Sequence, residues 1–258
     1  MICTANTDVG IVRDNNQDTF ILRKYSDKTC LCIVCDGMGG AKGGEEASSL
    51  AAETFAQVID DFITPFVGRK DKGFSVNDVK KAMKRALMMA NDAVYTKSRQ
   101  EPRLRGMGTT IVATLVIGNS VFCLNVGDSR MYFMKGAKIK QITKDHSYVQ
   151  HLLDIGKITK NDVEYQINKN IITRAVGTEI TVDPDIYKTA VSDGTFILLC
   201  TDGLCNHVED TAICDIVSND PAVSNIDEIG LDIKAKRLIE AANNNGGTDN
   251  ITVGLIKV

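Results

Sequence analysis

The order in which strand and helix patterns follow one another restricts the fold more than any other feature of this chain. Short apolar stretches typical of strands form two groups, and two longer amphipathic stretches typical of helices lie between them. The strands are predicted at 18–25, 30–35, 109–117, 120–126, 130–135, 138–142, 195–200 and 251–257. Strands and helices do not alternate as they would in βαβ units. The order therefore favours antiparallel sheets covered by helices, an α+β fold.

Two helices are predicted over 45–63 and 76–95, because apolar residues recur in both at the i, i+3, i+4 spacing of a helix face. Ser75, with Asp78 three residues later, is placed to cap the second helix. A third helix is expected near 231–243.

One domain over 1–258 is expected. Residues 67–74 and 99–108 are predicted loops, but neither is long or polar enough to indicate a linker. At this length a single core can bury roughly 70–75% of the surface that the unfolded chain exposes.

Composition excludes several classes of protein. The chain carries 30 Lys and Arg against 33 Asp and Glu, a formal net charge of −3, which argues against nucleic acid as the main partner. An apolar content of 43% argues against disorder. No apolar stretch approaches the roughly 20 residues of a membrane-spanning helix, and the first 20 residues lack the apolar segment of a signal peptide. A cytoplasmic protein without membrane contact is expected.

The eight cysteines are predicted to be buried free thiols of a reducing compartment. Cys30, Cys32 and Cys35 lie on one predicted strand, with the first two on one face and the third on the other. No second pair with metal-ligand spacing accompanies them, and the three histidines do not form a ligand motif either.

Aspartates beside glycine or asparagine stand where predicted strands begin or end. The pairs are Asp36-Gly37, Gly127-Asp128, Asp202-Gly203 and Asp249-Asn250. Carboxylate and carbonyl oxygens at such places suit hard cations such as Mg²⁺ and Mn²⁺. Asp and Gly also dominate ordinary turns, so the residues alone leave a metal site and turn chemistry both open.

The glycine-rich stretch 36–44 and Arg13 are two further candidates for phosphate binding. The glycine-rich stretch 36–44 matches neither G-x-G-x-x-G nor G-x-x-x-x-G-K-[ST], so a nucleotide-binding loop is not expected. Arg13 lies just before the first predicted strand, where it is either an ordinary surface residue or a bidentate clamp for phosphate. Spacing alone does not choose between these two roles.

Seven short motifs, taken together, resemble those of the metal-dependent serine/threonine protein phosphatases of type 2C in their compact bacterial form. The motifs are TDVGIVRDNNQD at 7–18, VCDGMGG at 34–40, GMGTT at 106–110, NVGDSR at 125–130, TRAVG at 173–177, CTDGLCN at 200–206 and GTDNIT at 247–252. Each is weak alone, but their order is specific and they span nearly the whole chain.

The resemblance implies an antiparallel β-sandwich flanked by pairs of helices, in α-β-β-α layers, with two Mn²⁺ or Mg²⁺ ions at one end. By motif, Asp36 would bridge the two ions and the Gly37 carbonyl would bind one of them. Asp202 and Asp249 would hold the first ion, and Asp18 would lie near the second.

The resemblance also assigns a weaker third ion to Asp128 together with Asp202, and the substrate phosphate to Arg13. Such an enzyme is a phosphoric monoester hydrolase that activates a water for direct in-line attack on phosphoserine or phosphothreonine. The expected partners are phosphoproteins, among them a Hanks-type serine/threonine kinase and its targets in a signalling system. Nothing in the sequence requires a dimer, and a monomer is expected.

Three departures from the family pattern bear on mechanism. Met38 stands where many eukaryotic members have a histidine that is a candidate general acid, and Asn206 stands where many have an aspartate. Residues 143–178 correspond to a mobile flap, predicted to gate protein substrates and to carry a short helix from Tyr148. Gln166-Ile167 replaces the usual His-Pro there.

An inactive scaffold and a regulatory phosphatase are two alternatives to a general active phosphatase. A catalytically inactive scaffold would have lost metal carboxylates, and these are present. A regulatory phosphatase for one dedicated signalling protein usually carries a sensor domain, for which 258 residues leave no room.

Overall fold

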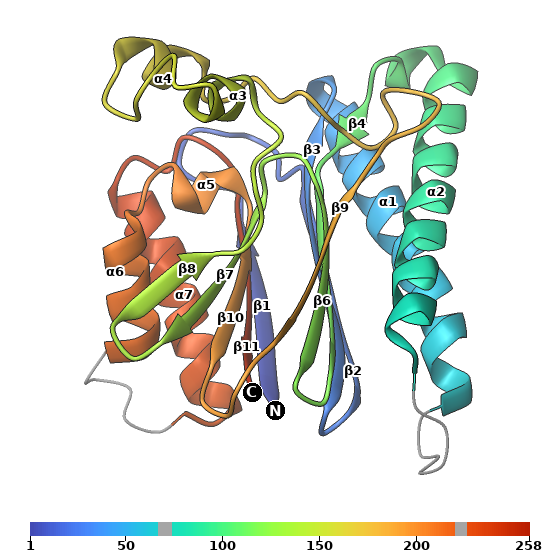
Figure 1. Cartoon of the computed structure of the whole chain (residues 1–258). Coiled ribbons are helices and arrows are strands. Elements are labelled where there is room, and N and C mark those ends of the chain that lie inside the picture. Colours follow the sequence, from blue (N-terminus) through green and yellow to red (C-terminus); the bar gives the residue numbers. More distant parts are fainter. Residues whose placement is uncertain (67–73, 220–225) are drawn as a thin grey trace.

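The computed structural model describes residues 1–66, 74–219 and 226–258. Two antiparallel sheets lie face to face, with helices on both outer faces (Figure 1). The predicted loop at 67–74 falls outside the described residues except for its last position.

One sheet has five strands in the order β1-β11-β10-β7-β8. Its strands are β1 (Ile2–Asp8), β7 (Arg130–Lys135), β8 (Lys138–Gln141), β10 (Phe196–Cys200) and β11 (Ile251–Lys257). The other sheet runs β2-β3-β5-β6-β9, and β4 pairs with β3 beside it. Its strands are β2 (Asp18–Ser26), β3 (Thr29–Met38), β4 (Gly108–Thr109), β5 (Ile111–Ile117), β6 (Ser120–Val126) and β9 (Asp185–Ala190).

The helices form three groups in Figure 1. Two long helices, α1 (Gly40–Ile63) and α2 (Val76–Gln100), cover the sheet that contains β3. The opposite sheet is covered by α5 (Asp202–Cys205), α6 (Asp210–Cys214) and α7 (Glu228–Asn244). Two short helices, α3 (Tyr148–Asp154) and α4 (Val163–Asn168), lie at the end of the sandwich. Short 3₁₀ segments occur at Thr64–Phe66 and Pro102–Leu104, and a π-helical segment at Asp215–Asn219.

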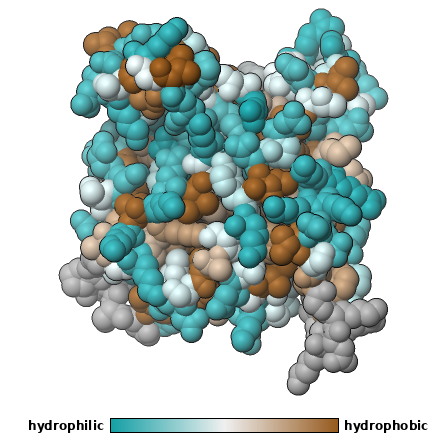
Figure 2. All heavy atoms as spheres, viewed as in Figure 1, coloured by the Kyte–Doolittle hydropathy of each residue, from teal (hydrophilic) through white to brown (hydrophobic). Residues whose placement is uncertain are grey.

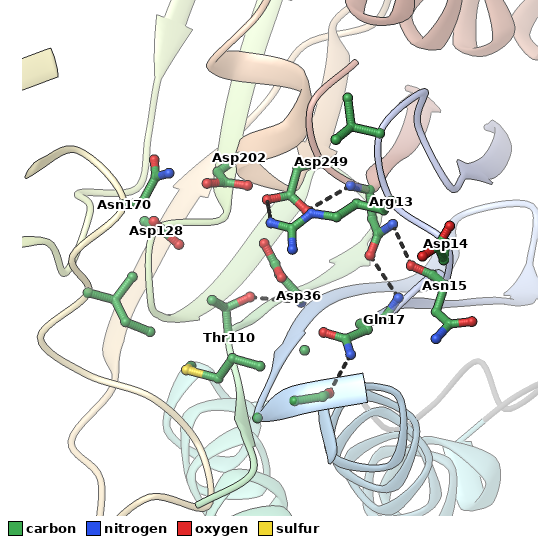
Figure 3. Close-up of a pocket in the computed structure, with 17 residues that line it drawn as sticks. Arg13, Asp14, Asn15, Gln17, Asp36, Thr110, Asp128, Asn170, Asp202 and Asp249 are labelled. Atoms are coloured by element: carbon green, nitrogen blue, oxygen red, sulfur yellow. Dashed lines mark hydrogen bonds and ion pairs between the residues drawn. The ribbon is translucent and has the colours of Figure 1, made fainter. Parts of the chain in front are cut away.

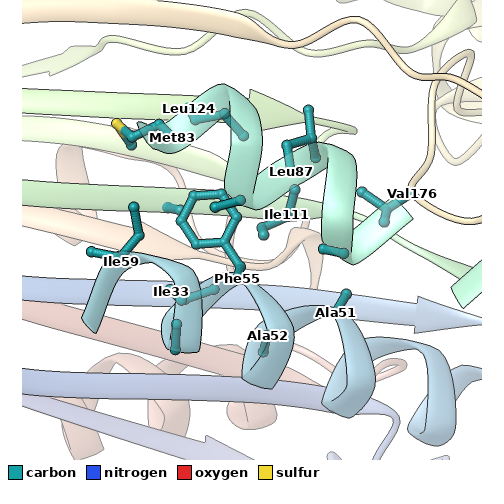
Figure 4. Packing of buried hydrophobic residues seen from close by; sticks show 14 of the residues in the cluster. Ile33, Ala51, Ala52, Phe55, Ile59, Met83, Leu87, Ile111, Leu124 and Val176 are labelled. Carbon is teal, nitrogen blue, oxygen red and sulfur yellow. The ribbon is translucent and has the colours of Figure 1, made fainter. Parts of the chain in front are cut away.

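Strand β3 is buried on both faces, which explains its continuous run of apolar residues. Leu31 and Ile33 pack toward α1 and α2, together with Phe55 and Met83 (Figure 4). The alternate residues, Cys30, Cys32 and Val34, pack between the two sheets. Cys35 lies on the helix-facing side. The predicted burial and facing of these thiols are confirmed, and all eight cysteines are free, but Cys3 and Cys205 are only partly buried.

The α+β class, with two antiparallel sheets covered by helices, is confirmed. Two of the differences from the predicted boundaries bear on the site. β3 continues through Asp36 and Gly37 to Met38, and α1 begins at Gly40 rather than at 45. Gly39, with φ 125°, makes the sharp change of direction between them.

The predicted cap of α2 is present, since the Ser75 side chain accepts a hydrogen bond from the Asp78 amide over 3.1 Å. Among the helices of the described ranges, none has the length and apolar character needed to cross a membrane.

Candidate active site

An acidic cleft of about 610 Å³ opens at the end of the sandwich, where Asn170 from the segment 143–178 also lines it (Figure 3). Six of the seven residues predicted from the sequence line it: Arg13, Asp36, Gly37, Asp128, Asp202 and Asp249. The seventh, Asp18, is buried on β2 beside Asp36. The structure therefore brings together residues that are separated by more than 200 positions in the chain.

The ends of β2 and β3 place two carboxylates next to each other. Asp18 and Asp36 are direct cross-strand partners in the antiparallel register. Like charges at such positions, with Cβ atoms about 5 Å apart, destabilise a sheet. Only one Asp18 oxygen is bonded, accepting from the Thr201 hydroxyl over 2.9 Å. The other is buried without a hydrogen-bond partner.

Three more carboxylates enter the cleft from other elements. Asp202 begins α5 directly after β10, Asp249 precedes β11, and Asp128 follows β6. One Asp202 oxygen is also buried without a partner, while the other accepts a hydrogen bond of 3.0 Å from the Asn206 amide.

Burial and mutual repulsion hold these groups toward the protonated form. Burial, followed by the charge of Asp18, raises the pKa of Asp36 well above its ordinary value. Burial raises the pKa of Asp18 to about 7, with Asp202 and Asp249 adding to the shift. The pKa values of Asp128 and Asp202 are raised for the same reasons. The positive charges of Arg130 and Lys169 act in the opposite direction on Asp202 but do not outweigh burial and repulsion.

Hydrogen bonds from its neighbours fix the backbone of Asp36. The Thr110 hydroxyl accepts from the Asp36 amide over 2.9 Å, and the Thr110 amide donates to the Asp36 carbonyl over 2.8 Å. The Thr109 hydroxyl donates to the same carbonyl over 2.8 Å. The carboxylate is thereby held at a defined place at the end of a rigid strand.

Gly37 lies where two backbone segments meet. A Cβ atom there would lie 2.1 Å from the Gly44 carbonyl oxygen and 2.5 Å from that of Gln17. The Gly37 amide donates to the Gln17 carbonyl over 3.2 Å. No side chain fits at this position, which explains glycine directly after Asp36.

Arg13 lies on a loop that is held against the last strand. Asn250 accepts from the Gln17 amide over 2.8 Å and donates to the carbonyls of Val9 and Asn15, each over 2.9 Å. The Arg13 guanidinium makes an ion pair of 2.8 Å with Asp249, and half of its side chain is exposed to solvent.

The donor set of the cleft fits hard divalent cations. Apart from Arg13, its charged groups are carboxylates. In the aspartate cluster two oxygens, one of Asp18 and one of Asp202, are buried without partners, and Asp18 and Asp36 face each other across strands. Such an arrangement is stable only when the charge is protonated or compensated by a cation. Among the described residues, no three acidic, histidine or cysteine side chains already surround one point closely enough to hold an ion. Arg13 is the cation that pairs with one carboxylate, Asp249.

Some residues of the site were not predicted from the sequence. Thr110, Thr201 and Asn250 act through hydrogen bonds to backbone or carboxylate groups. The available signal was their position inside the GMGTT, CTDGLCN and GTDNIT motifs.

Comparison with known proteins identifies the family. Residues 12–228 match the model of the family described as protein phosphatase 2C. The chain is 34% identical to protein phosphatase PhpP of Streptococcus pneumoniae over 254 residues, 98% of this chain and 95% of that protein. It is 33% identical to serine/threonine phosphatase stp of Listeria welshimeri over 251 residues, 97% of this chain and 93% of that protein.

Solved structures agree with the sequence comparisons. The serine/threonine phosphatase of S. agalactiae superimposes with a TM-score of 0.83 at 29% identity, covering 99% of this chain and 98% of that one. The catalytic domain of the phosphatase PstP, solved with two manganese ions, gives a TM-score of 0.77 at 34% identity, covering 98% and 96%.

The fold and the relatives define a hydrolase of phosphorylated proteins. The chain belongs to the protein phosphatase 2C family, and the predicted serine/threonine protein phosphatase is confirmed at that level.

Proposed function

We propose that the acidic cleft holds two divalent cations, Mn²⁺ or Mg²⁺, and that this centre carries the hydrolysis of phosphoserine and phosphothreonine. The observation that supports it most is the cross-strand pair Asp18 and Asp36, which lies beside buried carboxylate oxygens without partners. The two manganese ions in the structure of PstP support the same number here. When bound, such a pair of cations lowers the pKa of a water molecule and neutralises charge on phosphoryl oxygens.

The chain's own residues have distinct tasks in this proposal. Asp36, fixed by its backbone hydrogen bonds, lies between the two cation positions, and the Gly37 carbonyl faces one of them. Asp202 and Asp249 bind the first cation from the opposite sheet. Asp18 supports the second from β2. Because these groups come from rigid strand ends, they are positioned before any ligand arrives.

Arg13 is proposed to bind the substrate phosphate. Its guanidinium is half exposed at the cleft and pairs with Asp249. If Asp249 held a cation, its carboxylate would pair less with Arg13, and the planar guanidinium would be available for bidentate contact with phosphoryl oxygens. The ion pair with Asp249 therefore holds Arg13 close to where it is needed.

The leaving alkoxide needs a proton, and the cleft limits its source. Met38 lines the cleft, and its thioether has no proton to donate. No histidine is among the described residues that line the cleft. We propose that a water molecule supplies this proton.

A weaker third cation is proposed at Asp128 with Asp202. Asp128 is buried and faces the same cleft. The side-chain amide of Asn206 already donates to one carboxylate oxygen of Asp202, which reduces the acceptor capacity left for this ion.

Residues 143–178 are proposed to form a flap that contributes to substrate binding, because its residues Asn170 and Ile172 line the cleft. The substrates are phosphoproteins, as the relatives' names indicate. We further propose a serine/threonine kinase and its targets as partners. A cytoplasmic location is proposed because the cysteines are free thiols, as in a reducing compartment. The enzyme is proposed to be a monomer.

The function is tested by release of phosphate from a phosphothreonine peptide with Mn²⁺, compared between wild type and Asp36→Asn. We expect the variant to lose at least about 100-fold in rate, because even residues that only support a metal ligand typically cost 10–100-fold. Asp92→Asn, an exposed change on α2, is the matched control and should retain the wild-type rate. Equal rates in wild type and Asp36→Asn, or no release by either, would contradict the proposal.

A further inference from the structure

A second groove, of about 580 Å³, lies on the open side of the sandwich and shares no residue with the acidic cleft. It is bounded by the β7–β8 hairpin, by Ala190 at the end of β9 and by residues of the segment 191–195 that follows, and is called the β8–β9 groove. Both β8 and β9 are edge strands of their sheets and lie at the front in Figure 1. The space between the two sheets therefore opens to solvent on this side.

The floor of the β8–β9 groove is apolar. Phe133 and Val191 line it, and both pack against the cluster that fills the space between the sheets. Phe133 is only half-buried, so the inter-sheet core reaches the surface here. Figure 2, which views this face, shows apolar side chains in a hollow bordered by hydrophilic ones.

The rim of the groove is basic. Lys135, Lys138 and Lys140 line it, and no acidic side chain does so among the described residues. The strand register pairs Lys140 with Phe133 and Lys138 with Lys135, so the β8 lysines lie on the same face as Phe133. On a chain with a net charge of −3, this is a local reversal of sign.

Two of these lysines are not neutralised by any described residue. Lys135 donates to the Ser192 hydroxyl over 2.8 Å and to the Asp193 carbonyl over 3.1 Å, which fixes it against the far wall. Lys138 and Lys140 are exposed, and their side chains make no ion pair or hydrogen bond with a described residue. They are available to a partner of opposite charge.

We propose that the β8–β9 groove binds an extended acidic segment of a partner protein. Alternate residues on a strand are roughly 6.6 Å apart, so Lys138 and Lys140 match carboxylates at positions i and i+2 of an extended peptide. An apolar residue farther along the same face of that peptide would cover Phe133 and Val191. The charges give orientation and specificity, while burial of the apolar floor supplies the attraction.

The proposal concerns binding and does not rest on the catalytic centre. It is tested with a fluorescein-labelled peptide in which glutamate alternates with threonine and which ends in valine, by anisotropy in metal-free buffer. We expect saturable binding that weakens with salt, and a loss of about tenfold or more in affinity for Lys138→Glu/Lys140→Glu.

Lys81→Glu/Lys84→Glu is the matched control, because it reverses two exposed lysines on α2 and should bind the peptide as wild type does. Mn²⁺-dependent hydrolysis of a small aryl phosphate should be equal in all three proteins. That readout separates failure of the groove from failure of the phosphatase centre.

Three results would overturn the proposal. The first is equal peptide binding by wild type and the β8 variant. The second is tighter binding of a single-stranded oligonucleotide than of the peptide by the same groove. The third is a concentration-dependent dimer, measured by light scattering, that the β8 variant abolishes, which would make a second copy of the chain the occupant.

Discussion

His146 connects the flap to the strand end that carries Asp128. Its side chain is buried, and its Nδ1 accepts a hydrogen bond of 3.1 Å from the Gly127 amide. Its Nε2 lies 3.4 Å from an Asp185 oxygen and 3.2 Å from the Arg174 guanidinium. Because Nδ1 is an acceptor, the ring is neutral, with its proton on Nε2 directed to Asp185.

We predict that protonation of His146 destabilises the fold at mildly acid pH. Burial, and then the charge of Arg174, lowers its pKa below the ordinary 6.5, although Asp185 and Asp145 act in the opposite direction. Below pH 6.5 the unfolded chain therefore binds a proton that the folded chain resists. Stability contributed by the neutral ring is present above that pH and is lost as the pH falls.

The measurement is the free energy of unfolding by denaturant at pH 7.5 and 5.5. His146→Gln should show a smaller decrease between these values than wild type, whereas His151→Gln, at an exposed site on α3, should follow wild type. An unchanged decrease in the His146 variant would show that the Gly127 contact tolerates the charged ring.

At the residue scale, the sequence was most informative where one side chain has one chemistry. The aspartates of the cleft stood out as carboxylates at strand ends, where a metal site and an ordinary turn were both open, and the resemblance of the motifs to the family then assigned them to cations. Thr110 and Asn250 were not predicted, because their hydroxyl and amide groups serve many purposes and their task depends on backbone atoms far away in the chain. The ion pair between Arg13 and Asp249 could not be predicted either, because 236 residues separate them in the sequence.

A buried ion pair attaches the flap to β7. Arg130 donates to both Asp145 oxygens, over 3.0 Å and 2.7 Å, and their side chains are only 13% and 9% exposed. Arg130 also donates to the Tyr132 hydroxyl over 3.0 Å, and Gln141 donates to Asp145 over 2.9 Å. The first residues of the flap are therefore fixed to a rigid strand.

We predict that Asp145→Ala lowers the free energy of unfolding by about 3–5 kcal/mol, because it leaves the Arg130 charge buried without its partner. Asp154→Ala removes the exposed Lys144–Asp154 ion pair of the same segment and should leave stability unchanged. Both are measured by denaturant unfolding. Equal values for the two variants would mean that burial does not distinguish these ion pairs.

At the element scale, prediction succeeded for buried strands and long helices and failed at two of the four edge strands, β1 and β9. β3, β5 and β6 were predicted because their apolar runs are packed from both sides. β1 and β9 were not, because their sequences, ICTANTD and DIYKTA, carry polar residues at half-buried positions. The start of α1 was placed too late because Gly40, Gly43 and Gly44 are poor helix formers that tertiary packing overrides.

For the whole molecule, the distribution of charge matters more than its sum. The formal net charge of −3 conceals a cluster at the cleft in which Asp18, Asp36, Asp202 and Asp249 alone carry a formal charge of −4. Two divalent cations would add +4 and bring the total to −3 + 4 = +1. The lysine rim of the β8–β9 groove is a second local departure from that average. Bringing these carboxylates together therefore lowers the stability of the folded chain unless cations compensate their charge.

We predict that Mn²⁺ stabilises the folded chain. We also predict that Asp36→Asn melts above wild type without metal and below it with Mn²⁺. At a free concentration about 100 times the Kd, one bound ion contributes about 2.7 kcal/mol. For a chain of this size that raises Tm by about 5–10 °C. Without metal, Asp36→Asn should melt above wild type, because it removes the like charge opposite Asp18. With Mn²⁺, it should melt below wild type, because it lacks a ligand.

Differential scanning calorimetry in chelator and in excess Mn²⁺ measures both states without reference to activity. Asp92→Asn, the exposed control on α2, should gain as much from Mn²⁺ as wild type does. An equal gain by Asp36→Asn would remove Asp36 from the cation site while leaving the family assignment intact. A variant that melts below wild type in both buffers would show that the carboxylate stabilises the fold through its neighbours rather than through a cation.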